Sequence, residues 1–224
     1  MRAGIDRYLS EIQAAVGRID PRDVEAFVSI LFDAFRGRHS VFTLGNGASA
    51  ALASHMACDL GKGTATDLGR GHRVAALPRL RIMSLNDNAA LLTAYSNDIS
   101  YDDVFTEQLK NLLQPGDVVV GISGSGGSTN VLRAMAYARG QGAHTVGLTG
   151  LQPSAVQLKE LCDLCIQVPL HQIEQIEDLH VVVHHAVSVS LRSRIADAFL
   201  AEPLIEGEGP VVASELVTEI AADD

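Results

Sequence analysis

The chain has no tryptophan, few aromatic residues and no excess of positive charge. Aromatic side chains make up 4% of its 224 residues, and the formal net charge is −10. Nucleic-acid-binding surfaces need a basic field, often with aromatic stacking platforms, so we expect no nucleic-acid partner. The negative charge still permits an anionic small molecule, because backbone N–H groups can form a local phosphate site in an acidic protein.

Long hydrophobic runs and cysteines are also scarce. No run of 18 apolar residues occurs, so we expect no membrane span, and charges interrupt the apolar pattern of residues 1–13, which is not typical of a signal peptide. The three cysteines, Cys58, Cys162 and Cys165, are few enough to indicate a reducing, cytoplasmic location. The lone C-x-x-C pair has no second pair, which favours packing over a zinc knuckle.

Apolar segments that alternate with helical patterns predict an α/β fold. The segments are apolar throughout rather than at every second position, which is typical of a parallel sheet buried on both faces. We expect one domain with five parallel strands flanked by helices. The predicted strands are 41–45, 81–85, 117–123, 144–150 and 165–170, and the predicted helices between and after them are 49–60, 88–96, 101–113, 128–142 and 176–200.

Two helices are expected before the sheet. Apolar residues recur every three or four positions over residues 5–19, which indicates an amphipathic helix. Asp20 and Pro21 are typical of the start of a second helix, which Gly37 can end. Residues 1–37 are therefore expected to form a helical hairpin that belongs to the same domain.

The remaining segments set the expected domain limits. Residues 38–200 should form the main part of the single domain, with no linker that divides it. Residues 61–80 are rich in glycine and charge and are expected to form a loop. Residues 201–224 are expected to form an acidic tail.

Two glycine- and serine-rich loops indicate a phosphate site. LGNGASA (44–50) and GISGSGGST (121–129) each follow a predicted strand and precede a helix, so both lie at the carboxyl edge of the sheet, where ligands bind. Glycines let backbone N–H groups approach an anion, and the helix N-termini add partial positive charge. Neither loop has the lysine of a Walker A motif or the G-x-G-x-x-G spacing. A monophosphate group is the predicted ligand, and simple turns are the alternative.

Four side chains on two predicted helices could bind a metal. His55 and Asp59 are four residues apart and Glu177 and His185 eight apart, so each pair lies on one helix face. Two imidazoles and two carboxylates can form a tetrahedral zinc site. An ordinary exposed pair is the alternative for His55 and Asp59.

Two more histidines lie close to this set on the last helix. His180 is expected either to support the site or to belong to the core. His184 is rotated about 100° from His185 around the helix axis, so we expect a structural role for it.

In combination, several motifs resemble the sugar isomerase (SIS) domain, and within it the phosphoheptose isomerases. They are GNGAS, SHMACDL, VVVGISGSGGSTNVLRAMAYARGQGAHTVGLTG and QIEDLHVVVHH, and the resemblance covers roughly residues 1–198. It implies a flavodoxin-like three-layer fold and a homotetramer with sites between subunits. It also implies that a sugar phosphate is bound by residues of the two loops, namely Asn46, Ser49, Ser123, Gly124, Ser125 and Ser128.

The resemblance implies one zinc ion per subunit. His55, Asp59, Glu177 and His185 occupy positions where phosphoheptose isomerases have His, Glu, Gln and His. Asp59 is one methylene shorter than the family's glutamate, and Glu177 adds a negative charge. By the same resemblance Asp59 and His185 are the expected proton shuttles.

Three further residues, together with Glu177, are expected to contact the sugar. Asn97 and Asp98 lie in a segment similar to the family's ND-x-x-x-x-D-x-F, although a helix stop and N-cap would also explain them. Glu174 matches an aspartate that the family brings to the site from the start of the last helix.

The resemblance predicts an aldose–ketose isomerase that converts sedoheptulose 7-phosphate to D-glycero-D-manno-heptose 7-phosphate through a metal-assisted enediol mechanism. A non-catalytic SIS adaptor of the type that binds the replication initiator protein is one alternative. An isomerase of another phosphosugar is the second. All four metal positions carry competent ligands, which favours an enzyme over the adaptor.

Overall fold

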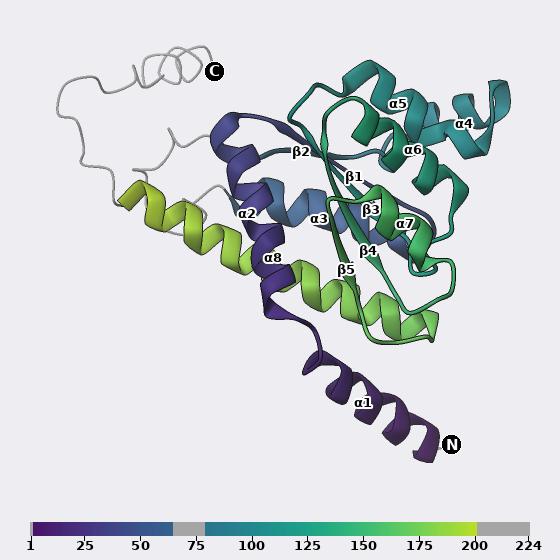
Figure 1. Cartoon of the computed structure of the whole chain (residues 1–224), viewed down its shortest axis with the longest axis vertical. Coiled ribbons are helices and arrows are strands. Elements are labelled where there is room, and N and C mark those ends of the chain that lie inside the picture. Colours follow the sequence, from purple (N-terminus) through teal and green to yellow (C-terminus); the bar gives the residue numbers. More distant parts are fainter. Residues whose placement is uncertain (1, 65–78, 201–224) are drawn as a thin grey trace, which may run out of the picture.

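The computed structural model describes residues 2–64 and 79–200 (Figure 1). Most of the predicted loop 61–80 and the whole predicted tail 201–224 lie outside the described residues. In chain order the elements are α1 (Arg2–Val16), α2 (Pro21–Gly37), β1 (Ser40–Gly45), α3 (Ala48–Gly63), β2 (Arg81–Ser84), α4 (Ala89–Asp98), the 3-10 helix η1 (Tyr101–Asp103), α5 (Val104–Leu112), β3 (Val118–Ile122), α6 (Thr129–Gly140), β4 (His144–Thr149), α7 (Ala155–Leu161), β5 (Leu164–Gln167) and α8 (Ile173–Leu200).

The five predicted strands form one parallel sheet in the order β2-β1-β3-β4-β5. The order reverses between β1 and β3, because β2 pairs on one side of β1 and all later strands lie on the other. Ligands of open parallel sheets bind at such a switch point, beyond the carboxyl ends of the strands. The fold therefore brings the loops after β1 and β3 together at the ligand-binding edge.

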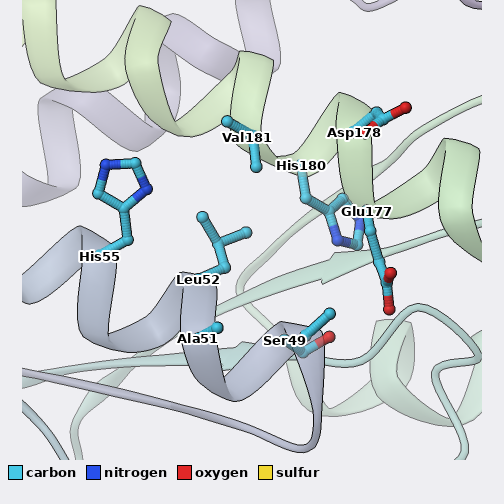
Figure 2. Close-up of a pocket in the computed structure, with 9 residues that line it drawn as sticks. Ser49, Ala51, Leu52, His55, Glu177, Asp178, His180 and Val181 are labelled. Atoms are coloured by element: carbon cyan, nitrogen blue, oxygen red, sulfur yellow. The ribbon is translucent and has the colours of Figure 1, made fainter.

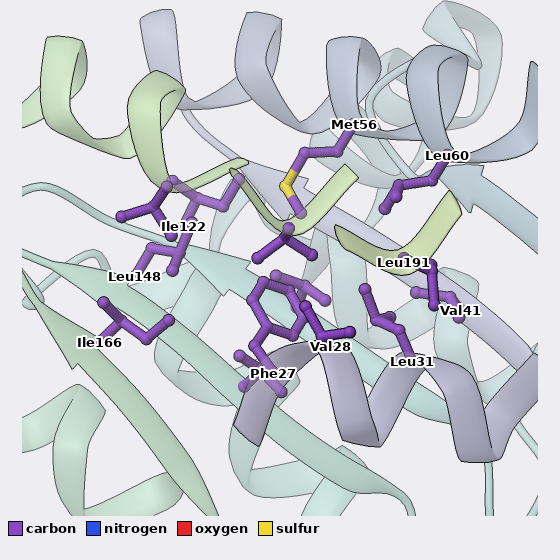
Figure 3. Packing of buried hydrophobic residues seen from close by; sticks show 14 of the residues in the cluster. Phe27, Val28, Leu31, Val41, Met56, Leu60, Ile122, Leu148, Ile166 and Leu191 are labelled. Carbon is purple, nitrogen blue, oxygen red and sulfur yellow. The ribbon is translucent and has the colours of Figure 1, made fainter. Parts of the chain in front are cut away.

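Helices cover both faces of this sheet, which confirms the three-layer prediction. On β3, Val118, Val120 and Ile122 belong to the hydrophobic cluster with α2, α3 and α8, whereas Val119 belongs to the cluster with α5 and α6. Figure 3 shows the first cluster, where Phe27 and Leu31 of α2 lie among strand and α8 side chains. Burying a Val, Leu or Phe side chain of this kind stabilises the fold by about 1.5–3 kcal/mol.

Both predicted N-terminal helices are present, but α1 does not fold back along α2. It projects from the domain and packs against α8 (Figure 1). The Tyr8 hydroxyl donates a hydrogen bond to Asp178, and the Gln175 side chain donates one to Glu11. The chain thus enters the domain through contacts with the last helix, so the expected hairpin is replaced by a helix pair opened at residues 17–20.

Two details of the helices differ from the prediction. α7 was not predicted, because its seven residues bury only Ala155 and Leu158 and give too short an apolar repeat. The predicted helix 101–113 is divided into η1 and α5, with Ser100 capping η1. Within the parts of the chain described, no helix is long and apolar enough to cross a membrane.

Candidate active site

The loop between β3 and α6 holds its serine hydroxyls in a fixed arrangement. The Ser123 hydroxyl donates to Ser128 Oγ at 3.2 Å and lies 3.4 Å from Ser125 Oγ. The backbone N–H of Gly127 donates to Ser125 Oγ at 3.2 Å. Three hydroxyls therefore already face one another before a ligand arrives, at the N-terminus of α6, where free N–H groups and the helix dipole favour an anion.

Gly126 is required by the tight turn of this loop. Its φ of 69° lies in the left-handed region, and an added Cβ would lie 2.4 Å from Ala155 Cα. Its N–H donates to both the carbonyl and the hydroxyl of Ser123. The loop can thus turn sharply over α7 only because this position lacks a side chain.

A pair of amide side chains joins this loop region to the loop after β1. Asn46 Nδ2 donates to Asn130 Oδ1 at 2.8 Å, and Asn130 Nδ2 donates to Asn46 Oδ1 at 2.9 Å. The Tyr101 hydroxyl also donates to Asn46 Oδ1 at 2.9 Å. The prediction included Asn46 but not Asn130 or Tyr101, whose partners lie 84 and 55 residues away along the chain.

All six residues predicted for the sugar phosphate from these loops line one cavity of about 160 Å³. We call this cavity the serine cup. No lysine or arginine occurs among the described residues that line it, so hydroxyls and N–H groups are its donors. The lining consists of Asn46, Ser49, Ile122, Ser123, Gly124, Ser125, Ser128, Ile173 and Glu177.

A larger pocket of about 330 Å³ adjoins the serine cup and shares Ser49 and Glu177 with it. Figure 2 shows this adjoining pocket between α3 and α8, with Ser49 near one end, His55 at the other and Leu52 between them. The two helices therefore line a pocket that extends from Ser49, beside the serine cup, to His55 of α3.

Glu177 lies where the two cavities meet. Its carboxylate extends toward the Ser49 end of the adjoining pocket in Figure 2. Burial raises the pKa of the Glu177 carboxyl, and the nearby carboxylates of Glu174 and Asp178 add to the effect. The Glu177 carboxyl therefore borders both cavities, and its protonation becomes easier as negative charge accumulates nearby.

Three histidines converge on one oxygen of Asp59. The distances from Asp59 Oδ2 are 3.1 Å to His55 Nε2, 3.2 Å to His184 Nε2 and 3.7 Å to His185 Nε2. The four potential ligand atoms lie within 4.8 Å of one another. Imidazole nitrogens and a carboxylate oxygen are ligands that zinc accepts, so this donor set fits the expected metal. We call these four residues the His/Asp cluster.

His184, for which a structural role was expected, also belongs to the His/Asp cluster. The angle of 100° separates adjacent residues at the helix axis. Long side chains can nevertheless meet at a point beside the helix, and the His184 and His185 ring centroids are only 4.9 Å apart. His184 is fully buried, and this burial lowers its pKa to about 4 despite the hydrogen bond with Asp59.

His180 belongs to the wall of the adjoining pocket and to the core behind it. It is fully buried, and neither ring nitrogen has a well-aligned hydrogen-bond partner among the described residues. Burial lowers its pKa to about 4, only partly opposed by the backbone of Thr149. His180 is therefore held as a neutral ring, as the second of the two roles expected for it requires.

The other predicted sugar contacts lie apart from these cavities. Asn97 and Asp98 are exposed at the end of α4 and bond to each other, Asn97 Nδ2 donating to Asp98 Oδ1. Glu174 is exposed in the first turn of α8. Within a single chain the structure thus assembles the loop serines and the His/Asp cluster, but it does not bring these three side chains to either cavity.

Comparison with known proteins places this arrangement in a family. The sequence profile described as "SIS domain" matches residues 7–150. The chain therefore belongs to the SIS domain family.

Its curated relatives are more specific. A phosphoheptose isomerase from Akkermansia muciniphila is 34% identical over 74% of this chain and 82% of its own length, and one from Synechocystis is 35% identical over 87% and 95%. The solved phosphoheptose isomerase from Neisseria gonorrhoeae superposes with a TM-score of 0.75 at 25% identity, covering 86% of this chain and 98% of that one. Within the SIS proteins, this chain is a member of the phosphoheptose isomerase family.

Proposed function

We propose that the chain converts sedoheptulose 7-phosphate to D-glycero-D-manno-heptose 7-phosphate. This proposal rests on one observation: the serine cup and the pocket that reaches the His/Asp cluster adjoin each other. A serine cup suited to a phosphate shares Ser49 and Glu177 with a pocket that reaches His55 of the His/Asp cluster. Relatives named phosphoheptose isomerase support the same reaction.

The spacing along α3 is consistent with a substrate of this length. Ser49 and His55 are six residues apart on the helix, which corresponds to about 9 Å along its axis. Seven bonds separate the phosphorus from C2 of an extended heptulose 7-phosphate. At about 3.6 Å for three extended bonds, that path spans about 8 Å. A phosphate in the serine cup would therefore leave C1 and C2 near the His55 end of the pocket.

The chemical step moves a proton between C1 and C2 through an enediol. We assign the proton transfers to Asp59 and His185, whose side chains lie in the His/Asp cluster. The N–H groups and hydroxyls of Ser123, Ser125 and Ser128 would bind and orient the phosphate without moving protons. A side chain positioned as a general acid or base, as proposed for Asp59 and His185, can accelerate proton transfer by about 10²–10⁴-fold.

The proposal includes one zinc ion per subunit. His55, Asp59 and His185 would hold it, and the fourth ligand would be either Glu177, as the resemblance implies, or His184, whose Nε2 lies 3.2 Å from Asp59 Oδ2. When bound, zinc would stabilise the negative charge that develops on the substrate's carbonyl oxygen. Each of these residues offers an imidazole nitrogen or a carboxylate oxygen, which supports the assignment.

We also propose a homotetramer in the cytoplasm, with sites near the subunit contacts. Exposed apolar residues support assembly: Ile5 and Leu9 of α1 are 59% and 60% exposed, and Val189 of α8 is 58% exposed. The side chains of His55 and His185 are 41% and 51% exposed, so a neighbouring subunit could complete the wall of the site. The three free cysteines are consistent with a reducing compartment.

The test is turnover of sedoheptulose 7-phosphate together with metal content. We expect about one zinc per chain, loss of turnover on chelation, and incorporation of solvent deuterium into the product during reaction in D₂O. His185→Ala should abolish turnover, whereas His171→Ala, at an exposed histidine outside both cavities, should keep it. Binding of the sugar phosphate without turnover by the zinc-loaded protein would favour the adaptor, and turnover only of a different phosphosugar would favour the other alternative.

A further inference from the structure

We propose that His184 is a metal ligand in this chain, so that the metal is held by three imidazoles and one carboxylate: His55, Asp59, His184 and His185. Glu177 would then remain in the sugar pocket. The inference concerns the same site as the proposed function and rests on it only for the metal's role in the reaction. Metal binding itself can be tested without any substrate.

The distances within the His/Asp cluster match a tetrahedral metal site. Zinc binds imidazole nitrogen and carboxylate oxygen at about 2.0–2.2 Å, so neighbouring ligand atoms of a tetrahedron lie about 3.3 Å apart. From Asp59 Oδ2 the three Nε2 atoms lie at 3.1, 3.2 and 3.7 Å. Every pair in the cluster is within 4.8 Å, so the widest pair would close by at most about 1.5 Å on binding.

The convergence of three rings is difficult to explain by hydrogen bonding alone. The ring centroids of His55, His184 and His185 lie 4.9–5.1 Å apart in all three pairings. One carboxylate oxygen has two lone pairs and accepts two N–H donors, so hydrogen bonding alone leaves the third ring without a partner at Asp59 Oδ2. A cation at the centre makes every one of these contacts attractive.

Ser188 supplies the supporting contact that a metal-binding histidine usually has. Its hydroxyl lies 3.3 Å from His184 Nδ1, one turn further along α8. A hydrogen bond from Nδ1–H to this hydroxyl leaves the Nε2 lone pair directed at Asp59 and the centre of the cluster. His184 is thus oriented from behind as well as placed at the correct distance.

Glu177 is the least suited of the candidate ligands in this arrangement. Its carboxylate is not among the atoms that lie within 4.8 Å of one another. In Figure 2 its side chain extends toward Ser49, while Leu52 and Val181 lie between it and His55. Eight residues separate it from His185, about 12 Å along α8, whereas His184 is adjacent to His185.

A donor set of three nitrogens and one oxygen also selects the class of metal. Imidazole suits Zn²⁺, Co²⁺, Ni²⁺ and Cu²⁺, whereas Mg²⁺ and Ca²⁺ prefer oxygen ligands. The site should therefore bind first-row transition metals and discriminate against magnesium and calcium.

The first experiment titrates the metal-free full-length protein with Co²⁺ in the absence of sugar and follows its visible absorption, with a competing chelator to measure affinity. His184→Leu should weaken binding by more than about 100-fold, because the loss of an outer contact alone typically costs 10–100-fold. His180→Leu is the matched control, since this ring is equally buried on the same helix but outside the cluster, and it should retain wild-type affinity. Glu177→Gln should also retain it. Weakening by Glu177→Gln but not by His184→Leu would overturn the proposal.

A second measurement needs no variant and covers the case in which His184→Leu fails to fold. X-ray absorption of the zinc-loaded wild-type protein should give three imidazoles per zinc; two imidazoles, or no bound zinc, would overturn the inference. Three imidazoles without turnover of sedoheptulose 7-phosphate would leave the inference standing while the proposed reaction fails. Turnover with only two imidazoles per zinc would overturn the inference while the proposed reaction stands.

Discussion

Asn46 and Asn130 form a reciprocal pair of amide hydrogen bonds that ties the loop after β1 to the first turn of α6. Because these are the two loops that make the serine cup, the pair sets the distance between Ser49 on one side and the β3–α6 serines on the other. Asn130 is buried, and its Oδ1 also accepts from the Val131 N–H. The shape of the serine cup thus depends on a contact between two loops that are far apart in the sequence.

Removing this contact should loosen the cup and destabilise the domain. Asn130→Ala removes the oxygen that accepts from Asn46 Nδ2 and from the Val131 N–H, and each unsatisfied buried group costs about 1–3 kcal/mol. We expect the free energy of unfolding to fall by about 2–3 kcal/mol and KM for the sugar phosphate to rise. Urea unfolding and steady-state kinetics would measure both. Asn111→Ala, at an exposed asparagine on α5, should change stability by less than about 0.5 kcal/mol, and equal losses for the two variants would contradict this role.

Gly126 should be intolerant of the smallest side chain. In Gly126→Ala the methyl group would meet Ala155 Cα at 2.4 Å and would hold alanine at a φ of 69°. We expect a loss of at least about 2 kcal/mol in the free energy of unfolding, from strain and displacement of α7. The matched change is Gly140→Ala at the end of α6, where nothing lies within 4 Å of the added methyl, and which should be neutral or stabilising by up to about 1 kcal/mol. Thermal unfolding of both variants and the wild type tests this prediction, and equal melting temperatures for the two variants would contradict it.

The serine hydroxyls should contribute to binding rather than to the chemical step. Ser125→Ala removes one donor to a charged phosphate, and such hydrogen bonds are worth about 1.5–3 kcal/mol. KM should therefore rise by about 10–100-fold while kcat changes little, as expected for an interaction present in both ground and transition states. Ser190→Ala, at an exposed serine of α8, should behave as the wild type. A fall in kcat with unchanged KM would show that Ser125 acts in the chemistry instead.

Burial of His180 should make the fold sensitive to acid. Its pKa is about 4 in the folded chain against 6.5 for an unperturbed histidine, so between these values the unfolded chain binds the proton more readily. The stability that depends on a neutral His180 is fully present above pH 6.5 and is lost as the pH falls toward 4. Below that pH the free energy of unfolding is lower by about 3 kcal/mol. His180→Leu should remove this part of the pH dependence. Urea unfolding of metal-free protein at several pH values between 4 and 7.5 tests it, and parallel curves for wild type and variant would refute it.

The parts of the fold that depend on long apolar runs were predictable. β3 is buried and apolar throughout, and β1 and β4 add only threonines to their buried apolar residues after the first position, so all three read as strands buried on both faces. α7 was missed because its repeat is too short to register. The expected hairpin failed for a different reason: the pattern of residues 5–19 indicates an apolar face but not its partner, and α1 contacts α8 while Ile5 and Leu9 of that face stay 59% and 60% exposed.

The residues of the candidate site were likewise predictable only in part. The cup serines were predictable because glycine and serine at a strand–helix junction have a direct physical meaning. Asn130 and Tyr101 were not, since their importance arises from partners far along the chain. The closeness of His184 to Asp59 was not predicted, because helix rotation gives the direction of a side chain at the axis and not the point that its tip reaches.

The absence of a cation among the described residues lining the serine cup has a kinetic consequence. A phosphosugar dianion that approaches a chain of net charge −10 is repelled at long range and gains attraction only on reaching the hydroxyls and N–H groups. Added salt screens the repulsion but hardly affects short hydrogen bonds. The rate constant for substrate binding should therefore increase with ionic strength, whereas it should decrease for a phosphate site built on lysines.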